Sequence, residues 1–137
     1  VQREGKEKGP FIYRARIDQL QPSTPYFYRV VAKSNEGEEM NSGIMTFSTA
    51  VLPEASFSFA VVGDTEARPH VNDRVAKLIW GERPNFLMIV GDLTDSGTKD
   101  HKFQWNYEYF QGITQLGSRV AVFPVPGNGE DDLYWYR

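Results

Sequence analysis

The chain has 137 residues, 40% of them apolar and 24% charged, and a formal net charge of −3, which indicates a globular protein of one domain or parts of two. The absence of cysteine excludes disulfides, thiolate zinc sites and cysteine nucleophiles, and the lack of a basic block argues against a nucleic-acid groove. The longest apolar run, Phe86 to Val90, is far shorter than the ~20 residues of a membrane span.

The first 50 residues have the pattern of short antiparallel strands. After a polar start over residues 1–10, alternation of bulky and polar side chains predicts strands at 11–17, 26–32 and 44–48, because successive side chains of a strand point to opposite faces. Turns rich in Pro, Ser, Asn and Gly separate them. Three short strands at this spacing favour an antiparallel sandwich.

Residues 20–30, Leu-Gln-Pro-Ser-Thr-Pro-Tyr-Phe-Tyr-Arg-Val, resemble the corner before a late strand of fibronectin type III domains. In that pattern a tyrosine hydroxyl hydrogen-bonds to the backbone a few residues upstream, and Tyr26 is the candidate. Such a sandwich needs about 100 residues, so we expect residues 1–50 to be only its last part. The start at Val1, without Met or an apolar signal region, fits a chain that is processed or begins inside a longer protein.

After a linker at residues 49–54 the periodicity changes. Near-continuous apolar runs ending at residues 62, 90 and 125 predict strands buried on both faces. Helices are expected at 70–80 and 100–116 between them. The β-α-β-α-β order of residues 55–137 predicts an α/β fold with a parallel sheet and right-handed crossovers. The expected buried stripes are Val71, Val75, Leu78 and Ile79 on the first helix, and Phe103, Tyr107, Phe110 and Ile113 on the second.

Each predicted strand of this part ends in a glycine followed by an oxygen-bearing side chain, namely Asp64, Asp92 and Asn128. Residues just past the carboxyl ends of parallel strands converge on one crevice. Carboxylate and amide oxygens gathered there suit a cation. One Gly-Asp pair is well explained by turn or helix-capping chemistry, but three in succession favour a metal site.

The ordered motifs Gly63-Asp64, Gly91-Asp92-Leu93-Thr94-Asp95 and Gly127-Asn128-Gly129-Glu130 resemble those of calcineurin-like metallophosphoesterases, nearest to the purple acid phosphatase-like branch. That branch commonly carries a fibronectin III-like domain in front. The resemblance implies that residues 55–137 are the first half of an αββα sandwich, preceded by the end of an all-β fibronectin III-like sandwich at 1–50.

The resemblance also implies a function. Asp92 would bridge two divalent or trivalent ions (Fe, Zn or Mn), with Asp64 holding one ion and Asn128 the other. The reaction would be hydrolysis of a small phosphate monoester or diester by a metal-bound hydroxide. The resemblance further suggests an extracytoplasmic or secreted protein with no nucleic-acid partner and no membrane span, and it leaves the oligomeric state open.

Several positions depart from the family pattern. The family's catalytic histidine falls at Gly129, which leaves Asp95 as a weak catalytic candidate that either positions substrate or caps its turn. Asp95 also stands where iron–tyrosinate members have a tyrosine, so a purple centre is not expected. Glu66 stands where the family has His or Gly; a polar loop residue is the favoured interpretation, and an extra ligand the alternative. The family completes its site with later histidines, so this segment alone is expected to be inactive.

Two alternatives to an active phosphoesterase follow. The first is a catalytically impaired relative that keeps metal or phosphate binding, as Gly129 suggests. The second is an adhesion or interaction module in which the α/β part is a scaffold. Among the remaining polar residues, the acidic run of residues 130–132 is expected to be a solvated face, with a second cation site as the alternative. His70 and His101 match no family ligand position and are expected to be solvated or to cap a helix.

Overall fold

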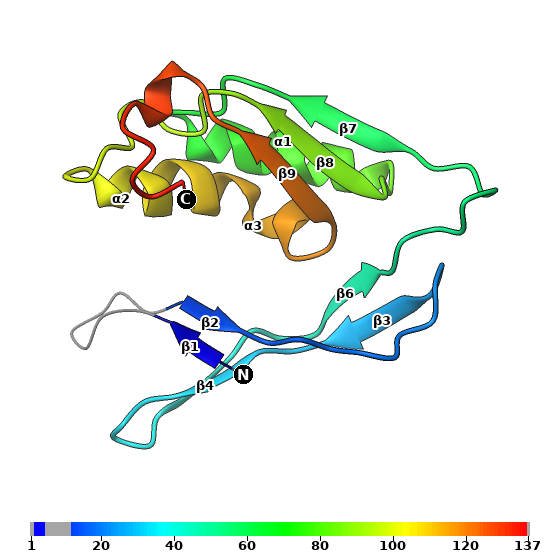
Figure 1. The fold of residues 1–137 in the computed structure, drawn as a ribbon. Coiled ribbons are helices and arrows are strands. Elements are labelled where there is room, and N and C mark those ends of the chain that lie inside the picture. The colour runs from blue at the N-terminus through cyan, green and yellow to red at the C-terminus, as the bar shows by residue number, and fades with distance from the viewer. Residues whose placement is uncertain (1, 5–11, 137) are drawn as a thin grey trace.

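The computed structural model describes residues 2–4 and 12–136 of the chain. Strand pairs from the first 48 residues lie beneath a unit of three parallel strands and helices (Figure 1). The extended segment of residues 49–58 connects the strand pairs to this unit at one end. Among the helices in this part of the chain, none has both the length and the apolar character needed to cross a membrane.

The N-terminal strands form antiparallel pairs. β1 (Gln2–Glu4) pairs with β2 (Ile12–Arg14), β3 (Pro25–Tyr28) with β6 (Met45–Ser48), and β4 (Val31–Lys33) with β5 (Glu39–Asn41). The strand predicted at 26–32 is therefore split in two. Residues 2–4, expected to belong to a polar start, form a strand, and residues 39–41, for which no strand is predicted, form another. The split has a local cause, because the Ser42 hydroxyl accepts the Val30 N–H at 2.8 Å and Gly43 turns the chain with a φ of 76°. Phe11 of the first predicted strand lies outside the described residues.

The tyrosine corner expected from the sequence is present as a hydrogen bond. The backbone N–H of Gln21 donates to the Tyr26 hydroxyl oxygen at 2.9 Å, and the Thr49 hydroxyl donates to the Gln21 carbonyl at 2.6 Å. These contacts fasten the turn before β3 to the end of β6. Further along the same strand, the Tyr28 hydroxyl donates to the Ser118 carbonyl at 2.5 Å, which joins the strand pairs to the α/β unit.

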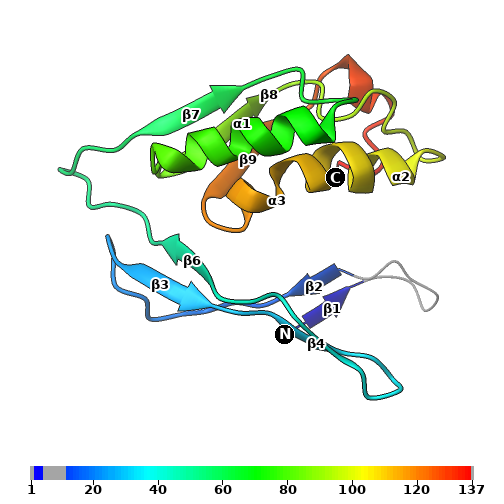
Figure 2. The same ribbon diagram turned by 180° about the vertical axis from the view of Figure 1, so that it is seen from behind.

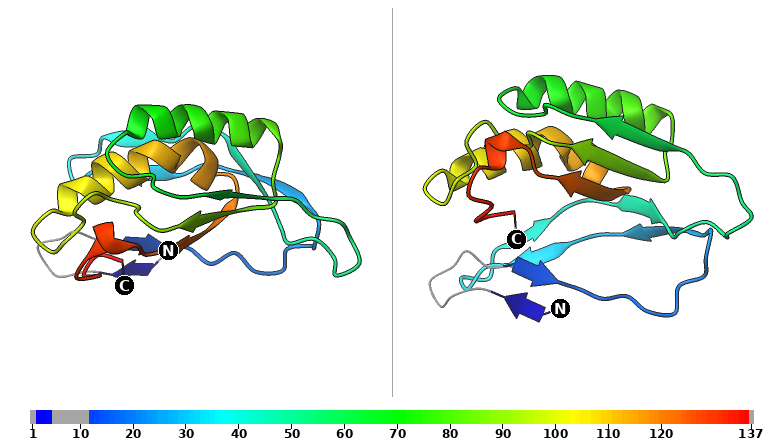
Figure 3. Two further views of the ribbon diagram at one scale, coloured as in Figure 1. Left: turned by 90° about the horizontal axis from the view of Figure 1, so that it is seen from above. Right: turned by 45° about the horizontal axis from the view of Figure 1, so that its top comes forward.

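The α/β unit has the predicted parallel sheet. β7 (Phe59–Val62), β8 (Phe86–Val90) and β9 (Ala121–Val125) pair in the order β7-β8-β9, so β8 is central. The crossovers are α1 (Pro69–Gly81) and a continuous helical segment of α2 (Lys102–Gln104), the π-helix η1 (Trp105–Phe110) and α3 (Gln111–Gly117). Right-handed crossovers that advance in one direction place their helices on the same face, and Figures 2 and 3 show α1 and α3 side by side there.

The core lies between this helical layer and one face of the sheet. Leu87 and Ile89 of β8 are 1% and 0% exposed, whereas Phe59 and Phe123 on the opposite face are 50% and 55% exposed. The prediction of strands buried on both faces is therefore wrong for the described residues, which cover one face only. On the open face, the rings of Phe59 and Phe86 stack at 5.0 Å between centroids.

Each predicted helix stripe is confirmed at one position, since Ile79 and Ile113 are partly buried and pack against the core, and is wrong at others. On α1 the buried residue is Ala76, while Leu78 is 74% exposed. On the second helical segment the buried side chains are Trp105, Glu108, Tyr109 and Leu116, whereas Phe103, Tyr107 and Phe110 are at least half exposed. The buried positions 105, 109, 112 and 116 still follow a helical repeat, so the predicted stripe is displaced around the helix and is not broken.

Candidate metal centre

Asp64 and Asp92, which follow adjacent parallel strands, lie close together as predicted. Backbone pairing continues past the strand ends: Asp64 N–H donates to the Gly91 carbonyl at 3.3 Å, and Thr65 N–H donates to the Asp92 carbonyl at 2.8 Å. One carboxylate oxygen from each of Asp64, Glu66 and Asp92 lies within 4.8 Å of the other two. We call these three residues the acidic cluster.

Two members of the acidic cluster have left-handed backbone. Asp64 has a φ of 52° and Asp92 a φ of 48°. Residues other than glycine rarely adopt this backbone conformation, which costs of order 1–3 kcal/mol where it is strained. Such outliers concentrate at functional sites, where the surrounding structure imposes them. Both strand ends therefore hold an aspartate in a conformation that a glycine would adopt more easily.

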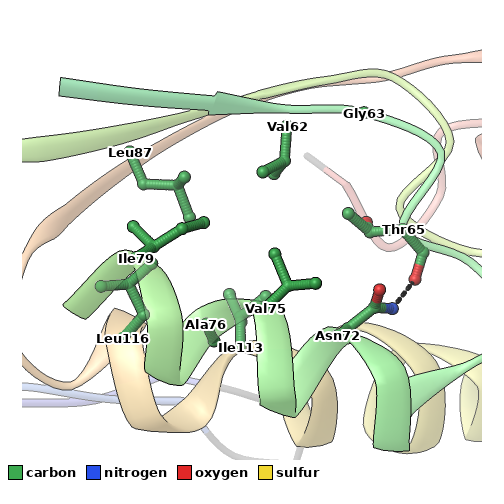
Figure 4. A pocket seen from close by; sticks show the side chains of 10 residues that line it. All are labelled: Val62, Gly63, Thr65, Asn72, Val75, Ala76, Ile79, Leu87, Ile113 and Leu116. Carbon is green, nitrogen blue, oxygen red and sulfur yellow. Dashed lines mark hydrogen bonds between the residues drawn. The ribbon is translucent and has the colours of Figure 1, made fainter. Parts of the chain in front are cut away.

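The loop after β7 places Asp64 and Glu66 on one side and Thr65 on the other. Because Asp64 has left-handed backbone, this arrangement comes from the bent loop and not from the alternation of an extended strand. Thr65, 7% exposed, turns inward and lines a pocket of about 260 Å³ beneath the loop. The Asn72 side-chain amide from α1 donates to the Thr65 carbonyl (Figure 4). Apart from Thr65 and Asn72 the pocket is lined by apolar side chains and Gly63. It therefore has no charged group for phosphate chemistry.

The third loop, after β9, packs directly on Asp92. The Gly129 N–H donates to Asp92 Oδ1 at 3.0 Å, and a Cβ placed on Gly127 would lie 2.1 Å from the same oxygen. Asn128, between these glycines, is exposed at the start of the 3-10 helix η2 (Asn128–Glu130). The backbone of Asn128 is therefore beside the acidic cluster.

Gly129 is tightly enclosed as well. A Cβ added there would lie 1.9 Å from the Thr94 carbonyl oxygen, and the Gly129 carbonyl accepts the Gly97 N–H at 2.9 Å. Since both contacts involve backbone, a side chain at this position requires the two loops to separate. Gly129, where the resemblance predicts a histidine, thus lies where the loops after β8 and β9 approach each other closely.

Glu130 is fully buried, at 0% exposure, so the expected solvated face of residues 130–132 is wrong at Glu130, whereas Asp131 and Asp132 are exposed. Its Oε1 accepts the N–H groups of Leu93 and Thr94 at 2.7 and 2.8 Å and the Thr94 hydroxyl at 3.2 Å. Its Oε2 accepts the Gly127 N–H at 2.6 Å. One carboxylate therefore ties the loop after β8 to the loop after β9.

The remaining donors of the loop after β8 are also bonded. Asp95 N–H donates to the Glu108 carboxylate at 2.8 Å, and Ser96 N–H to the Gln104 side-chain oxygen at 2.6 Å. The Trp105 indole N–H donates to the Gly97 carbonyl at 2.7 Å. These supporting side chains come from α2, which carries Gln104, and from η1, which carries Trp105 and Glu108. All three contact the loop that follows Asp92.

The other predicted residues are outside the acidic cluster. Asp95 is exposed and is not a member of it. His70 is exposed at the start of α1, and His101 is exposed before α2, where its Nδ1 lies 2.9 Å from the Thr98 hydroxyl. Within the described part of the chain, the structure thus gathers Asp64 and Asp92 with Glu66, for which the sequence interpretation favoured a plain loop role.

The donor set of the acidic cluster fits a cation. Three carboxylates at this spacing repel one another, and none of the ion pairs formed among the described residues includes them. The Glu66 Oε2 atom is buried and is without a hydrogen-bond partner in that part of the chain. Buried carboxylate oxygens are normally bonded or coordinated to metal. Oxygen ligands of this kind suit hard cations such as Mg²⁺, Ca²⁺ and Mn²⁺.

Comparison with known proteins agrees with this geometry. Residues 57–137 match the sequence profile of the calcineurin-like phosphoesterase family. Purple acid phosphatase 15 of Arabidopsis thaliana is 24% identical over 143 aligned residues, which cover 89% of this chain and 26% of that protein. A purple acid phosphatase from yellow lupin (Lupinus luteus) seeds has a similar fold, with a TM-score of 0.63 and 19% identity over 82% of this chain and 22% of that one. The chain thus spans about a quarter of the length of these relatives.

Proposed function

This chain belongs to the calcineurin-like phosphoesterase family, and from that premise we propose that the protein hydrolyses phosphate monoesters or diesters at a site that holds two metal ions. The observation that carries the proposal is the acidic cluster, in which Asp64 and Asp92 from adjacent strand ends meet with an orphaned carboxylate oxygen beside them. The likeness to purple acid phosphatases supports a phosphate-ester substrate.

The strand order supports a division of labour among the ligands. Asp92 follows the central strand β8, next to the loops after β7 and β9, and is proposed to bridge the two ions. Asp64 and Asn128 follow the outer strands, and each is proposed to hold one ion. When bound, a pair of cations (Fe, Zn or Mn) neutralises phosphate oxygens and activates water near neutral pH.

The protein's own contribution is positioning. Glu130 accepts N–H groups from the residue just after the proposed bridging ligand and from the loop after β9. Glu108 and Gln104 bind the backbone further along the loop after β8. A site held in this way needs little rearrangement when charge develops on the phosphate. Asp95, exposed in the same loop, is proposed as a residue that contacts substrate.

Gly129 favours a second candidate function, a relative that binds metal and phosphate but turns over slowly. No side chain at this position can donate a proton to a leaving group, and such an acid is worth about 10²–10⁴-fold in rate. The contact of Gly129 with the loop after β8 means that a histidine cannot simply be restored there. Substrates with acidic leaving groups, which need no proton donor, are therefore the appropriate probes.

The test is hydrolysis of p-nitrophenyl phosphate by the purified full-length protein with Mn²⁺ and again with chelator. Chelator-sensitive turnover that is lost in Asp92→Asn is expected, while Asp73→Asn, which removes a carboxylate from the outer side of α1, keeps full rate. Turnover that survives both chelator and Asp92→Asn would refute the proposal. Metal-dependent phosphate binding without turnover would select the second candidate.

The N-terminal part is proposed to be the end of a fibronectin III-like sandwich, so that the chain divides into residues 1–50 and 55–137. The Tyr26 hydrogen bond to Gln21 supports this proposal, since a tyrosine in such a corner bonds to the backbone upstream of its strand. An extracytoplasmic location stays a prediction.

A further inference from the structure

We infer that Glu66 is a third carboxylate ligand of this metal site, and that it shifts the site's preference toward hard cations such as Mn²⁺ and Mg²⁺. The inference rests on the proposed function and adds a ligand at a position where the family has His or Gly. It concerns the ion that Asp64 would hold, because both residues are in the loop after β7.

The first argument is distance. One oxygen each of Glu66, Asp64 and Asp92 lies within 4.8 Å of the others, so all three lie at most about 2.8 Å from a common centre, and small side-chain rotations bring them to the 2.0–2.6 Å of metal–oxygen bonds. A single cation can therefore contact all three carboxylates without a change of fold.

The second argument is the state of the Glu66 side chain. Its Oε2 is buried and has no hydrogen-bond partner among the described residues. A glutamate with only a solvated loop role would extend its carboxylate into water, where each oxygen is hydrated. Here one oxygen of a carboxylate that belongs to the acidic cluster is instead shielded from water without a partner among the described residues. That arrangement is unfavourable by itself and is stabilised when a cation binds the carboxylate.

The third argument is the local backbone. Asp64 and Ala67 both have left-handed φ values, 52° and 60°, and the Arg68 N–H donates to the Glu66 carbonyl at 2.7 Å. Together with the buried Thr65, these bends keep the chain from entering α1 directly after the strand. The short loop therefore holds Glu66 beside the strand end instead of releasing it toward solvent.

The chemical consequence concerns metal choice. Asp64, Glu66, Asp92 and Asn128 all offer oxygen, the donor that Mg²⁺, Ca²⁺ and Mn²⁺ prefer, whereas imidazole nitrogen suits Zn²⁺ and Fe. Zn²⁺ generally binds a given site more tightly than Mn²⁺, so the informative quantity is the ratio of the two dissociation constants.

The experiment measures Mn²⁺ binding to the chelator-treated protein by electron paramagnetic resonance of the free ion, for wild type, Glu66→Gln and Asp92→Asn. Glu66→Gln is expected to weaken binding at least tenfold, as loss of even a residue that only supports a ligand costs about 10–100-fold. Glu82→Gln, the same substitution at an exposed site after α1, is expected to bind as wild type does.

A melting curve separates a ligand from a structural residue. In chelator, Glu66→Gln should melt at or above the wild-type temperature, because one of the mutually repelling charges is gone, yet a given Mn²⁺ concentration should raise its melting point less than that of the wild type. Glu66→His should move the Mn²⁺-to-Zn²⁺ ratio of dissociation constants toward Zn²⁺.

Two results would overturn the inference. One is Mn²⁺ binding by Glu66→Gln that is weakened less than tenfold while Asp92→Asn loses binding, which leaves the proposed function intact. The other is a lower melting point of Glu66→Gln in chelator, which would assign Glu66 a structural role. If Asp92→Asn also binds Mn²⁺ normally, the proposed metal site itself fails.

Discussion

Replacing Glu130 with glutamine tests whether one buried carboxylate holds the two ligand-bearing loops together. In the native protein its two oxygens accept three N–H groups and one hydroxyl, at distances of 2.6–3.2 Å. Glutamine keeps one oxygen, which can accept from Leu93 and Thr94. Its amide group then points a donor at the Gly127 N–H, which loses its acceptor.

The size of the effect follows from these contacts. A hydrogen bond to a charged group contributes about 1.5–3 kcal/mol, and an unsatisfied buried donor costs about 1–3 kcal/mol. Loss of the Gly127 bond, together with weaker bonds to the neutral oxygen, gives an expected loss of roughly 3–5 kcal/mol. This is a large share of the total stability of about 5–15 kcal/mol that a typical domain has.

The assay is urea unfolding in the presence of chelator, so that metal binding does not contribute. The midpoint should fall with little change in the urea dependence, since the folded surface is the same. Glu82→Gln is the matched control and should stay within about 0.5 kcal/mol of wild type, as surface substitutions do. A loss below about 1 kcal/mol for Glu130→Gln would show that water or another group replaces the carboxylate.

The other predictions concern the pH dependence of stability, the close packing around Gly129 and the hydrogen bond of Tyr26. Burial, and secondarily Tyr136, raises the pKa of Tyr109 to about 12; since the folded state holds this proton more tightly than the unfolded state, stability should fall as pH rises from 10 toward 12, and Tyr109→Phe should remove that part of the loss in alkaline unfolding curves. Gly129→Ala should destabilise by about 1–3 kcal/mol or more because of overpacking, whereas Gly81→Ala, whose added methyl meets nothing within 4 Å, should be neutral or stabilising in the same thermal melts. Tyr26→Phe should cost about 0.5–1.5 kcal/mol through loss of one hydrogen bond, and unchanged urea stability would contradict the corner role.

The sequence predicted the α/β part well because its evidence was strong and local. Long apolar runs ending in Gly-Asp predicted the parallel strands and placed Asp64 and Asp92 at one edge. The helix stripes are only partly right, because a helix rich in apolar residues offers more than one face with a 3.6-residue repeat. Only tertiary contacts decide which face is buried, and they leave Leu78 and Phe103 exposed.

The candidate site was predictable as far as strand ends alone determine it. The sequence favours a solvated loop role for Glu66, because a glutamate in a loop is usually solvated. The left-handed backbone of Asp64 and Ala67, which bends this loop, is not indicated by the sequence pattern. Glu130 was assigned to a charged surface, since nothing in an acidic run indicates which member is buried. Its partners are the backbone N–H groups of Leu93, which is distant in sequence, and of Gly127. A pattern of side chains does not indicate which backbone groups bind a carboxylate.

The position of β8 between β7 and β9 gives the proposed ligand positions unequal freedom to change during evolution. Asp64 belongs to an outer strand and so borders one neighbouring loop, and a substitution there can be accommodated within that pair. Asp92 borders both, because its carbonyl accepts from Thr65 and its carboxylate accepts from Gly129. Descendants that exchange one metal for another should therefore vary first at the outer strands, and the central aspartate should be the last ligand to change.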